Sequence, residues 1–193
     1  MGIRNTMRLA LAFLASALLL AAAPVSQADE QRPIHKPLTP EEEKALSKMP
    51  GVEGVDWLRM RLIDASFPDE RTVLTWPKAY RQLFLLNLFE GEVLNGGIHQ
   101  FFFNSSGDFA PQIALTLREV GMTNYAQAVE KGMAMFPQPY PVDLGKRRRY
   151  FSPNATKTTP WDKELDALTP DVDDVAINAA MLALAKQEGL LRE

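Results

Sequence analysis

The segment from about Pro77 to Asn95 is apolar on nearly every face of a helix, and it constrains the fold more than any other feature. Its apolar stripe consists of Tyr80, Leu83, Phe84, Leu88, Gly91 and Leu94, and the remaining surface is largely covered by Leu85, Leu86, Phe89 and Val93. A helix that is apolar all round is buried among other elements. We therefore expect it at the centre of the domain, with another backbone close to Gly91, because a glycine inside a helix otherwise costs stability.

Shorter helical patterns flank this segment. The segment itself should end at Asn95-Gly96-Gly97, where a glycine can adopt the left-handed conformation of a helix C-cap. The expected helices are 39–49, 55–65, 98–103, 109–120, 123–136 and 171–188. Thr39 and Thr123 are expected N-caps, Thr169-Pro170 should start the last helix, and Gly189 should stop it. A strand is the alternative at 98–103, because aromatic runs suit sheets. The sequence thus predicts an all-α fold: a single compact domain over 39–193 with six or seven helices around a central apolar helix.

Residues 1–28 have the three parts of a secretory signal peptide. Arg4 and Arg8 give a positive start, and an uncharged run follows at 9–23, shorter than the roughly 20 residues of a membrane span. Small residues then precede Asp29, where we expect cleavage; an uncleaved anchor is the alternative. The mature protein should therefore be exported, periplasmic or secreted, with no membrane contact after cleavage.

Composition limits the class of the mature protein. Removal of residues 1–28 takes away two arginines and no acid, which leaves 24 acidic and 19 basic residues and a formal charge of −5. This modest negative charge is ordinary for solubility and does not indicate the basic surface that nucleic-acid binding needs. The chain has no cysteine, so disulfides, thiolate chemistry and a lipid-anchored cysteine are excluded. Residues 29–38 contain two prolines among charges and indicate a flexible leader.

No catalytic set is recognisable. His35 lies in the leader, so a Ser/His/Asp triad would have to use His99, and no Gly-x-Ser-x-Gly elbow surrounds Ser105 or Ser106. Glu90 falls within the apolar stripe. A buried carboxylate there is either an acid with a raised pKa or, more often, a structural hydrogen-bond hub. We expect no enzymatic activity.

Metal ligands are equally sparse. The chain has no histidine pair at helical spacing and no cysteine. Asp171, Asp173 and Asp174 offer oxygen ligands, but the glycine that a calcium loop needs at its sixth position is replaced by Ala176. Acids at a helix start are better explained by the helix dipole. We expect neither a metal nor a cofactor.

Two charged segments follow one another in the C-terminal half. The basic run 146–149 lies in the proline-rich stretch 137–161 and is expected to be solvated and mobile. The acids crowd the next segment: Asp162, Glu164, Asp166, Asp171, Asp173 and Asp174. We expect these acids to form an anionic surface that binds a protein partner with a basic surface, and not nucleic acid.

Residues 92–107 read Glu-Val-x-Asn-Gly-Gly-x-x-Gln-Phe-Phe-x-Asn-Ser-Ser-Gly, a pattern that resembles the bacterial DNA-mimic protein family. The shared domain of that family is otherwise of unknown function. The resemblance extends over about 75–137. It implies an all-α fold and a binding role rather than catalysis. In the named member, acidic side chains imitate DNA phosphates and occupy a DNA-binding protein. The motif residues, which we expect to be mainly structural, are Glu92, Asn95, Gly96, Gly97, Gln100, Asn104 and Gly107. We expect the amides of Asn95, Gln100 and Asn104 to pair backbone groups; binding of a ligand is the alternative for Gln100 and Asn104.

Three functions follow from these observations. The leading hypothesis is an exported, non-enzymatic helical domain that binds a protein partner in an inhibitor or immunity-type role. The second is a periplasmic hydrolase that uses Glu90 or His99. The third is a DNA mimic that occupies a DNA-binding protein, which the signal peptide and the modest negative charge disfavour.

Overall fold

The computed structural model describes residues 35–152 and 159–192, and this part of the chain is all-helical, without a strand. The predicted signal peptide and most of the predicted leader lie outside the described residues. The described part of the chain contains α1 (Pro40–Leu46), α2 (Gly51–Ser66), the 3-10 helix η1 (Glu70–Thr75), α3 (Lys78–Phe103), the 3-10 helix η2 (Ser105–Phe109), α4 (Ala110–Glu119), α5 (Thr123–Ala134), α6 (Leu144–Arg148), α7 (Pro160–Asp166) and α8 (Asp174–Gln187). None of the helices in these two ranges has the length and apolarity to cross a membrane.

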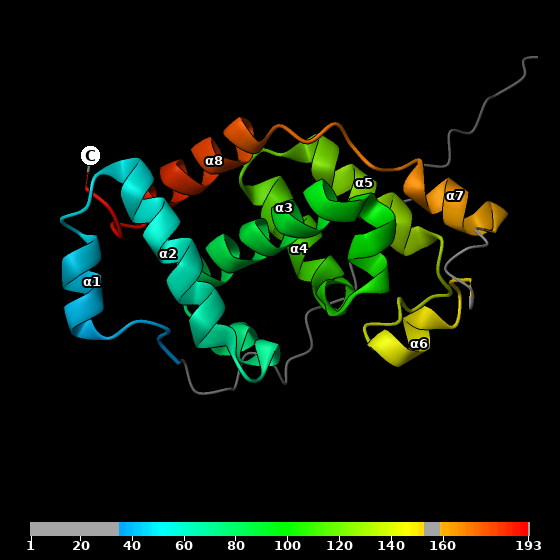
Figure 1. The fold of residues 1–193 in the computed structure, drawn as a ribbon, viewed down its shortest axis with the longest axis horizontal. Coiled ribbons are helices and arrows are strands. Elements are labelled where there is room, and N and C mark those ends of the chain that lie inside the picture. Colours follow the sequence, from blue (N-terminus) through cyan, green and yellow to red (C-terminus); the bar gives the residue numbers. More distant parts are fainter. Residues whose placement is uncertain (1–34, 153–158, 193) are drawn as a thin grey trace, which may run out of the picture.

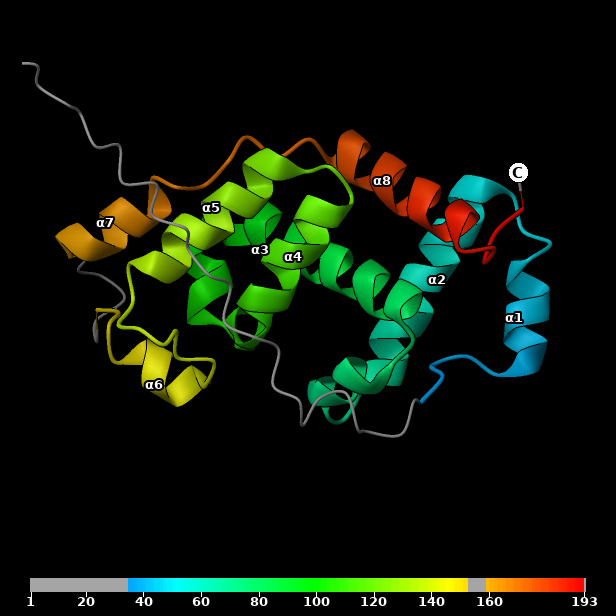
Figure 2. The same cartoon turned by 180° about the vertical axis from the view of Figure 1, so that it is seen from behind.

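Helix α3 lies at the centre, as predicted. It contacts α2 and α8 on one side and α4 and α5 on the other, while α1 lies at one end of the molecule and α6 and α7 at the opposite end (Figures 1 and 2). Its fully buried side chains include Leu83, Leu85, Leu86, Phe89, Ile98, Phe101 and Phe102. Burial on this scale is the main stabilising contribution that a cysteine-free chain can make.

One face of α3 is exposed, although the sequence predicted burial all round the helix. Leu94 is 55% exposed, and a side chain added at Gly91 would meet no atom within 4 Å. No backbone of residues 35–152 or 159–192 approaches Gly91, so the expected close contact is not found there. The apolar pattern around the whole helix did not reveal this uncovered face.

The predicted helix end at Gly96-Gly97 is a break within α3. Gly97 adopts φ +70° and ψ −172°, after which the chain resumes helical geometry to Phe103. The short helix 98–103 is therefore confirmed, and the strand alternative is wrong. Thr169 does not start the last helix; its hydroxyl accepts a 3.0 Å hydrogen bond from the Ile98 N–H and so caps the second half of α3.

Other helix boundaries also differ from the predicted ones. Thr123 is the first residue of α5 and provides no side-chain cap. Helix α8 begins at Asp174 with Asp173 as N-cap, later than predicted, and Gly189 ends it with a positive φ as predicted. Helices α6 and α7 were not predicted. Pro37 and Leu38 of the predicted flexible leader are buried, and Leu38 belongs to the core, whereas His35 and Lys36 are exposed.

The basic run is not uniformly solvated, because Arg147 is completely buried. Its guanidinium donates to the carbonyls of Phe102 (3.1 Å) and Asn104 (2.7 Å) and to the carboxylate of Asp108 (2.6 Å). The last carbonyls of a helix lack partners within that helix. Arg147 supplies hydrogen-bond partners to these carbonyls at the end of α3. The prediction that the basic run is solvated and mobile is therefore wrong for this residue.

A second arginine, which is only partly buried, joins three helices. Arg59 of α2 donates to Asn87 of α3 (2.7 Å) and Asn178 of α8 (2.5 Å) and forms an ion pair with the buried carboxylate of Glu90. Burial raises the pKa of Glu90, and the positive charge of Arg59 opposes that shift. Glu90 is therefore the structural hub that the sequence favoured.

We predict opposite effects of alanine at two glycines of α3. Gly97→Ala should lower the free energy of unfolding by about 1–3 kcal/mol, because this region of backbone conformation is nearly restricted to glycine. Gly91→Ala should raise it by about 0.5–1 kcal/mol, because the site is helical and open. Urea unfolding at constant pH measures both. A Gly97→Ala protein as stable as the wild type would contradict the described break.

Candidate functional site

The side chain of Glu92 organises the family motif. Its carboxylate accepts hydrogen bonds from the amide nitrogens of Gln100 and Asn104, both at 2.9 Å, and from the hydroxyl of Ser106. Glu92 precedes the break in α3, and all three donors follow it. The motif residues therefore connect the two halves of the broken helix through a carboxylate, rather than by pairing backbone groups as expected.

The motif glycines provide the space for this arrangement. A side chain at Gly96 would lie 2.2 Å from the amide oxygen of Gln100, so only glycine lets Gln100 fold back toward Glu92. A side chain at Gly107 would lie 2.8 Å from Nε of Arg147. Gly107 thus lets the buried arginine reach the end of α3.

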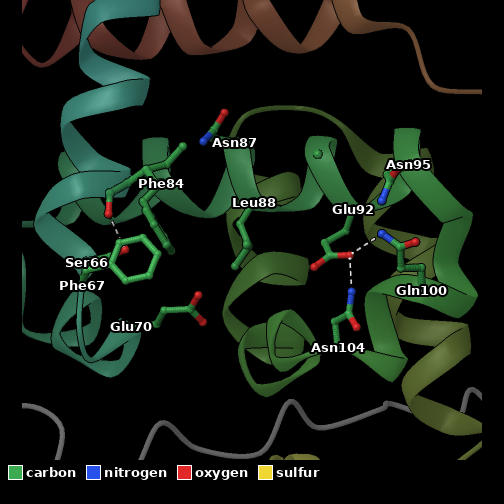
Figure 3. A pocket seen from close by; sticks show the side chains of 12 residues that line it. Ser66, Phe67, Glu70, Phe84, Asn87, Leu88, Glu92, Asn95, Gln100 and Asn104 are labelled. Carbon is green, nitrogen blue, oxygen red and sulfur yellow. Dashed lines mark hydrogen bonds between the residues drawn. The ribbon is translucent and has the colours of Figure 1, made fainter.

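Asn95 behaves differently from the other motif residues. Its side chain is exposed and has no hydrogen bond to the described parts of the chain. The expectation that it holds the fold is not supported by any contact of its side chain. Asn95 instead lines a groove on the uncovered face of α3 (Figure 3).

This groove has a volume of about 490 Å³ and lies between the end of α2, η1 and the motif. It is lined by Ile63, Ser66, Phe67, Glu70, Phe84, Asn87, Leu88, Gly91, Glu92, Asn95, Gln100 and Asn104. In Figure 3, the side chains of Glu70 and Glu92 stand on either side of Leu88. Glu70 was missed by sequence reasoning, because nothing in its neighbourhood indicates that η1 meets the motif face of α3.

His99 is held by contacts that serve packing. Its Nε2 lies 3.3 Å from a carboxylate oxygen of Asp162, and its ring packs against Phe103 and Phe151. Ser106 donates to Glu92, as described above, and the described contacts do not pair it with His99. In residues 35–152 and 159–192, no group of three or more Asp, Glu or His side chains is arranged to hold a metal ion.

Asp162 is buried, so its predicted place on an exposed anionic surface is wrong. Its carboxylate accepts hydrogen bonds from the backbone N–H (2.7 Å) and hydroxyl (2.8 Å) of Thr159 at the start of α7. Burial raises the pKa of Asp162, but the hydrogen bonds from Thr159 and His99 outweigh this effect and lower the pKa overall.

The other five predicted acids are exposed, but they do not form a compact patch. Glu164 and Asp166 lie on α7, Asp171 lies in the connection, and Asp173 and Asp174 lie at the start of α8. The connection between α7 and α8 runs extended along one side of the molecule (Figures 1 and 2). We call these five residues the acidic strip. Asp173 also has a structural role, because its side chain accepts from the Ala176 N–H and caps α8.

We predict that the motif stability depends on Glu92 and not on Asn95. Glu92→Gln should lower the free energy of unfolding by about 1–3 kcal/mol, because a new amide nitrogen would face the donors of Gln100 and Asn104. Asn95→Ala should change it by less than about 0.5 kcal/mol, as expected for an exposed side chain. Thermal and urea unfolding measure both variants. Equal losses in both would contradict the hydrogen bonds described for this site.

Comparison with known proteins agrees with the motif. Residues 75–186 match the family described as DMP19-like protein, a range that includes the motif and the acidic strip. No curated protein and no solved structure matches the chain. The family suggests a DNA-mimic protein and implies a DNA-binding protein as partner. Because the match covers more than half of the chain, this protein belongs to the DMP19-like family of DNA-mimic proteins.

Proposed function

We propose that this protein is an exported, non-enzymatic binding protein that occupies a basic surface of a protein partner, as an inhibitor or immunity-type factor. The observation that carries this proposal is the acidic strip. All five of its carboxylates are exposed, and none forms an ion pair within the described ranges. Their charge is therefore available to a partner.

The family supports the same kind of partner. A DNA-binding protein presents a basic surface, and carboxylates placed along an extended segment offer it a row of negative charges. Charges of this kind mainly accelerate association and select the partner. The net charge of the mature chain is modest, so the local arrangement matters more than the total.

A role without catalysis is consistent with the contacts of Glu90 and His99, the two residues that the hydrolase hypothesis needs. Glu90 is paired with Arg59, and His99 is held by Asp162 and two aromatic rings. Both side chains are used in connections between elements. A general acid or base must instead reach a substrate.

A DNA mimic inside the cell is the second candidate, favoured by the family match alone. The two candidates differ in where the partner is found. An exported protein would meet its partner outside the cytoplasm. An intracellular mimic would stay in the cytoplasm and would either keep residues 1–28 or lose them without being translocated.

We predict a salt-dependent association through the acidic strip. Partners are captured from periplasmic extract with the wild type, and the triple variant Glu164→Gln, Asp166→Asn and Asp171→Asn is then compared with it. Association should slow about tenfold at about 0.1 M salt. The two proteins should converge near 1 M salt, where the Debye length is about 3 Å. Asp173 is left intact because it caps α8.

The matched control removes the same charge elsewhere, at three exposed acids of α1 and α2: Glu41→Gln, Glu53→Gln and Asp56→Asn. This control should associate almost as fast as the wild type. An identical slowing in both triple variants would assign the effect to total charge and remove the strip from the interface.

We also predict that the exported protein begins at Asp29. Expression of the full chain in a bacterial host, followed by intact-mass analysis of the periplasmic fraction, measures the N-terminus directly. Retention of residues 1–28, or confinement of the protein to the cytoplasm, would support the intracellular DNA mimic instead.

A further inference from the structure

The groove beside the motif has an excess of hydrogen-bond acceptors. Gln100 and Asn104 direct their amide nitrogens at Glu92, which leaves their amide oxygens without a partner in the described ranges. The carboxylate of Glu70 has no hydrogen bond or ion pair there either. A ligand that fills the groove must therefore supply donors.

The charge of the groove is also uncompensated. Glu92 is held by three neutral donors, and no cationic residue is among those that line the groove. The guanidinium of Arg59 is committed to Glu90, Asn87 and Asn178. Two carboxylates that line the same groove attract a cation more strongly than either carboxylate would alone.

The floor of the groove is apolar. Phe84 is almost fully buried beneath it, Leu88 lies between the two carboxylates, and Phe67 is 67% exposed at its edge (Figure 3). A single large exposed aromatic ring beside acceptors is suited to a chain of methylene groups or to the face of a cation. A neutral polar ligand such as a sugar would leave both carboxylates without a counter-charge.

We propose that this groove binds a lysine or arginine side chain of a protein partner, with its cationic group between Glu70 and Glu92 and its methylene stem along Leu88 and Phe67. This rests on the proposed function, because it requires a protein partner with a basic surface. It adds a specific pocket to the diffuse attraction of the acidic strip. The motif residues Glu92, Gln100 and Asn104 then both hold the fold and recognise the partner.

The test uses the purified protein labelled with ¹⁵N and three probes. The first is a blocked pentapeptide, Gly-Gly-Lys-Gly-Gly; the second is the same peptide with norleucine in place of lysine; the third is free 1,4-diaminobutane. The lysine peptide should shift the side-chain NH₂ signals of Gln100 and Asn104 and the backbone signal of Gly91, in a saturable manner. The norleucine peptide should not.

Two variants with the same change of charge locate the effect. Glu70→Gln should weaken binding of the lysine peptide about three- to fivefold, the loss expected for one partly solvated ion pair. Glu164→Gln, in the acidic strip, should leave it unchanged. Within the described part of the chain, the Glu70 side chain makes no hydrogen bond or ion pair, so its variant should remain folded.

The proposal would be overturned by an absence of shifts at the groove, by equal shifts with norleucine, or by an unaltered affinity in Glu70→Gln. Tighter binding of free diamine than of the lysine peptide would also overturn it, because the natural occupant would then be a small amine. None of these results would change the salt test of the acidic strip, which concerns residues outside the groove. A failure of the groove is therefore distinguishable from a failure of the protein-binding role.

Discussion

The carboxylate of Glu92 is the interaction on which the rest of the site depends. It accepts hydrogen bonds from three side chains that follow the break in α3, and so it fixes the angle between the two halves of that helix. That angle places Gln100 and Asn104 beside the uncovered face of the first half. Without this carboxylate the groove would lose both a wall and half of its charge.

Two other charged contacts act in a comparable way at different points of α3. Arg59 ties its first half to α2 and α8 through the buried Glu90, and Arg147 closes its end through backbone carbonyls and Asp108. A buried ion pair adds little net stability, because desolvation opposes the attraction. Loss of either partner alone is costly, however, so such contacts favour one arrangement of helices over others.

The features predicted correctly were local in sequence. The apolar run 77–95 gave the central helix, and the two glycines that follow it gave the break, because both signals depend on neighbouring residues. Arg147 was misjudged because its partners Phe102 and Asn104 lie 45 and 43 residues earlier in the chain. Glu70 was missed for the same reason, since only packing brings η1 to the motif. The family motif could be recognised from sequence, whereas the hub role of Glu92 could not.

The capping of the short helix after the break has a consequence for the order of assembly. Its first N–H group is paired by Thr169, 71 residues later, and its last carbonyls by Arg147. A chain that ended before these residues would leave this segment open at both ends, with no partner for groups that cannot stay unpaired in an apolar interior. Closing such long loops is slow compared with forming local helices. We therefore expect this segment in the middle of the sequence to be among the last to reach its final form. A fragment that contains the complete motif but lacks α6 and Thr169 should then fail to reproduce the groove.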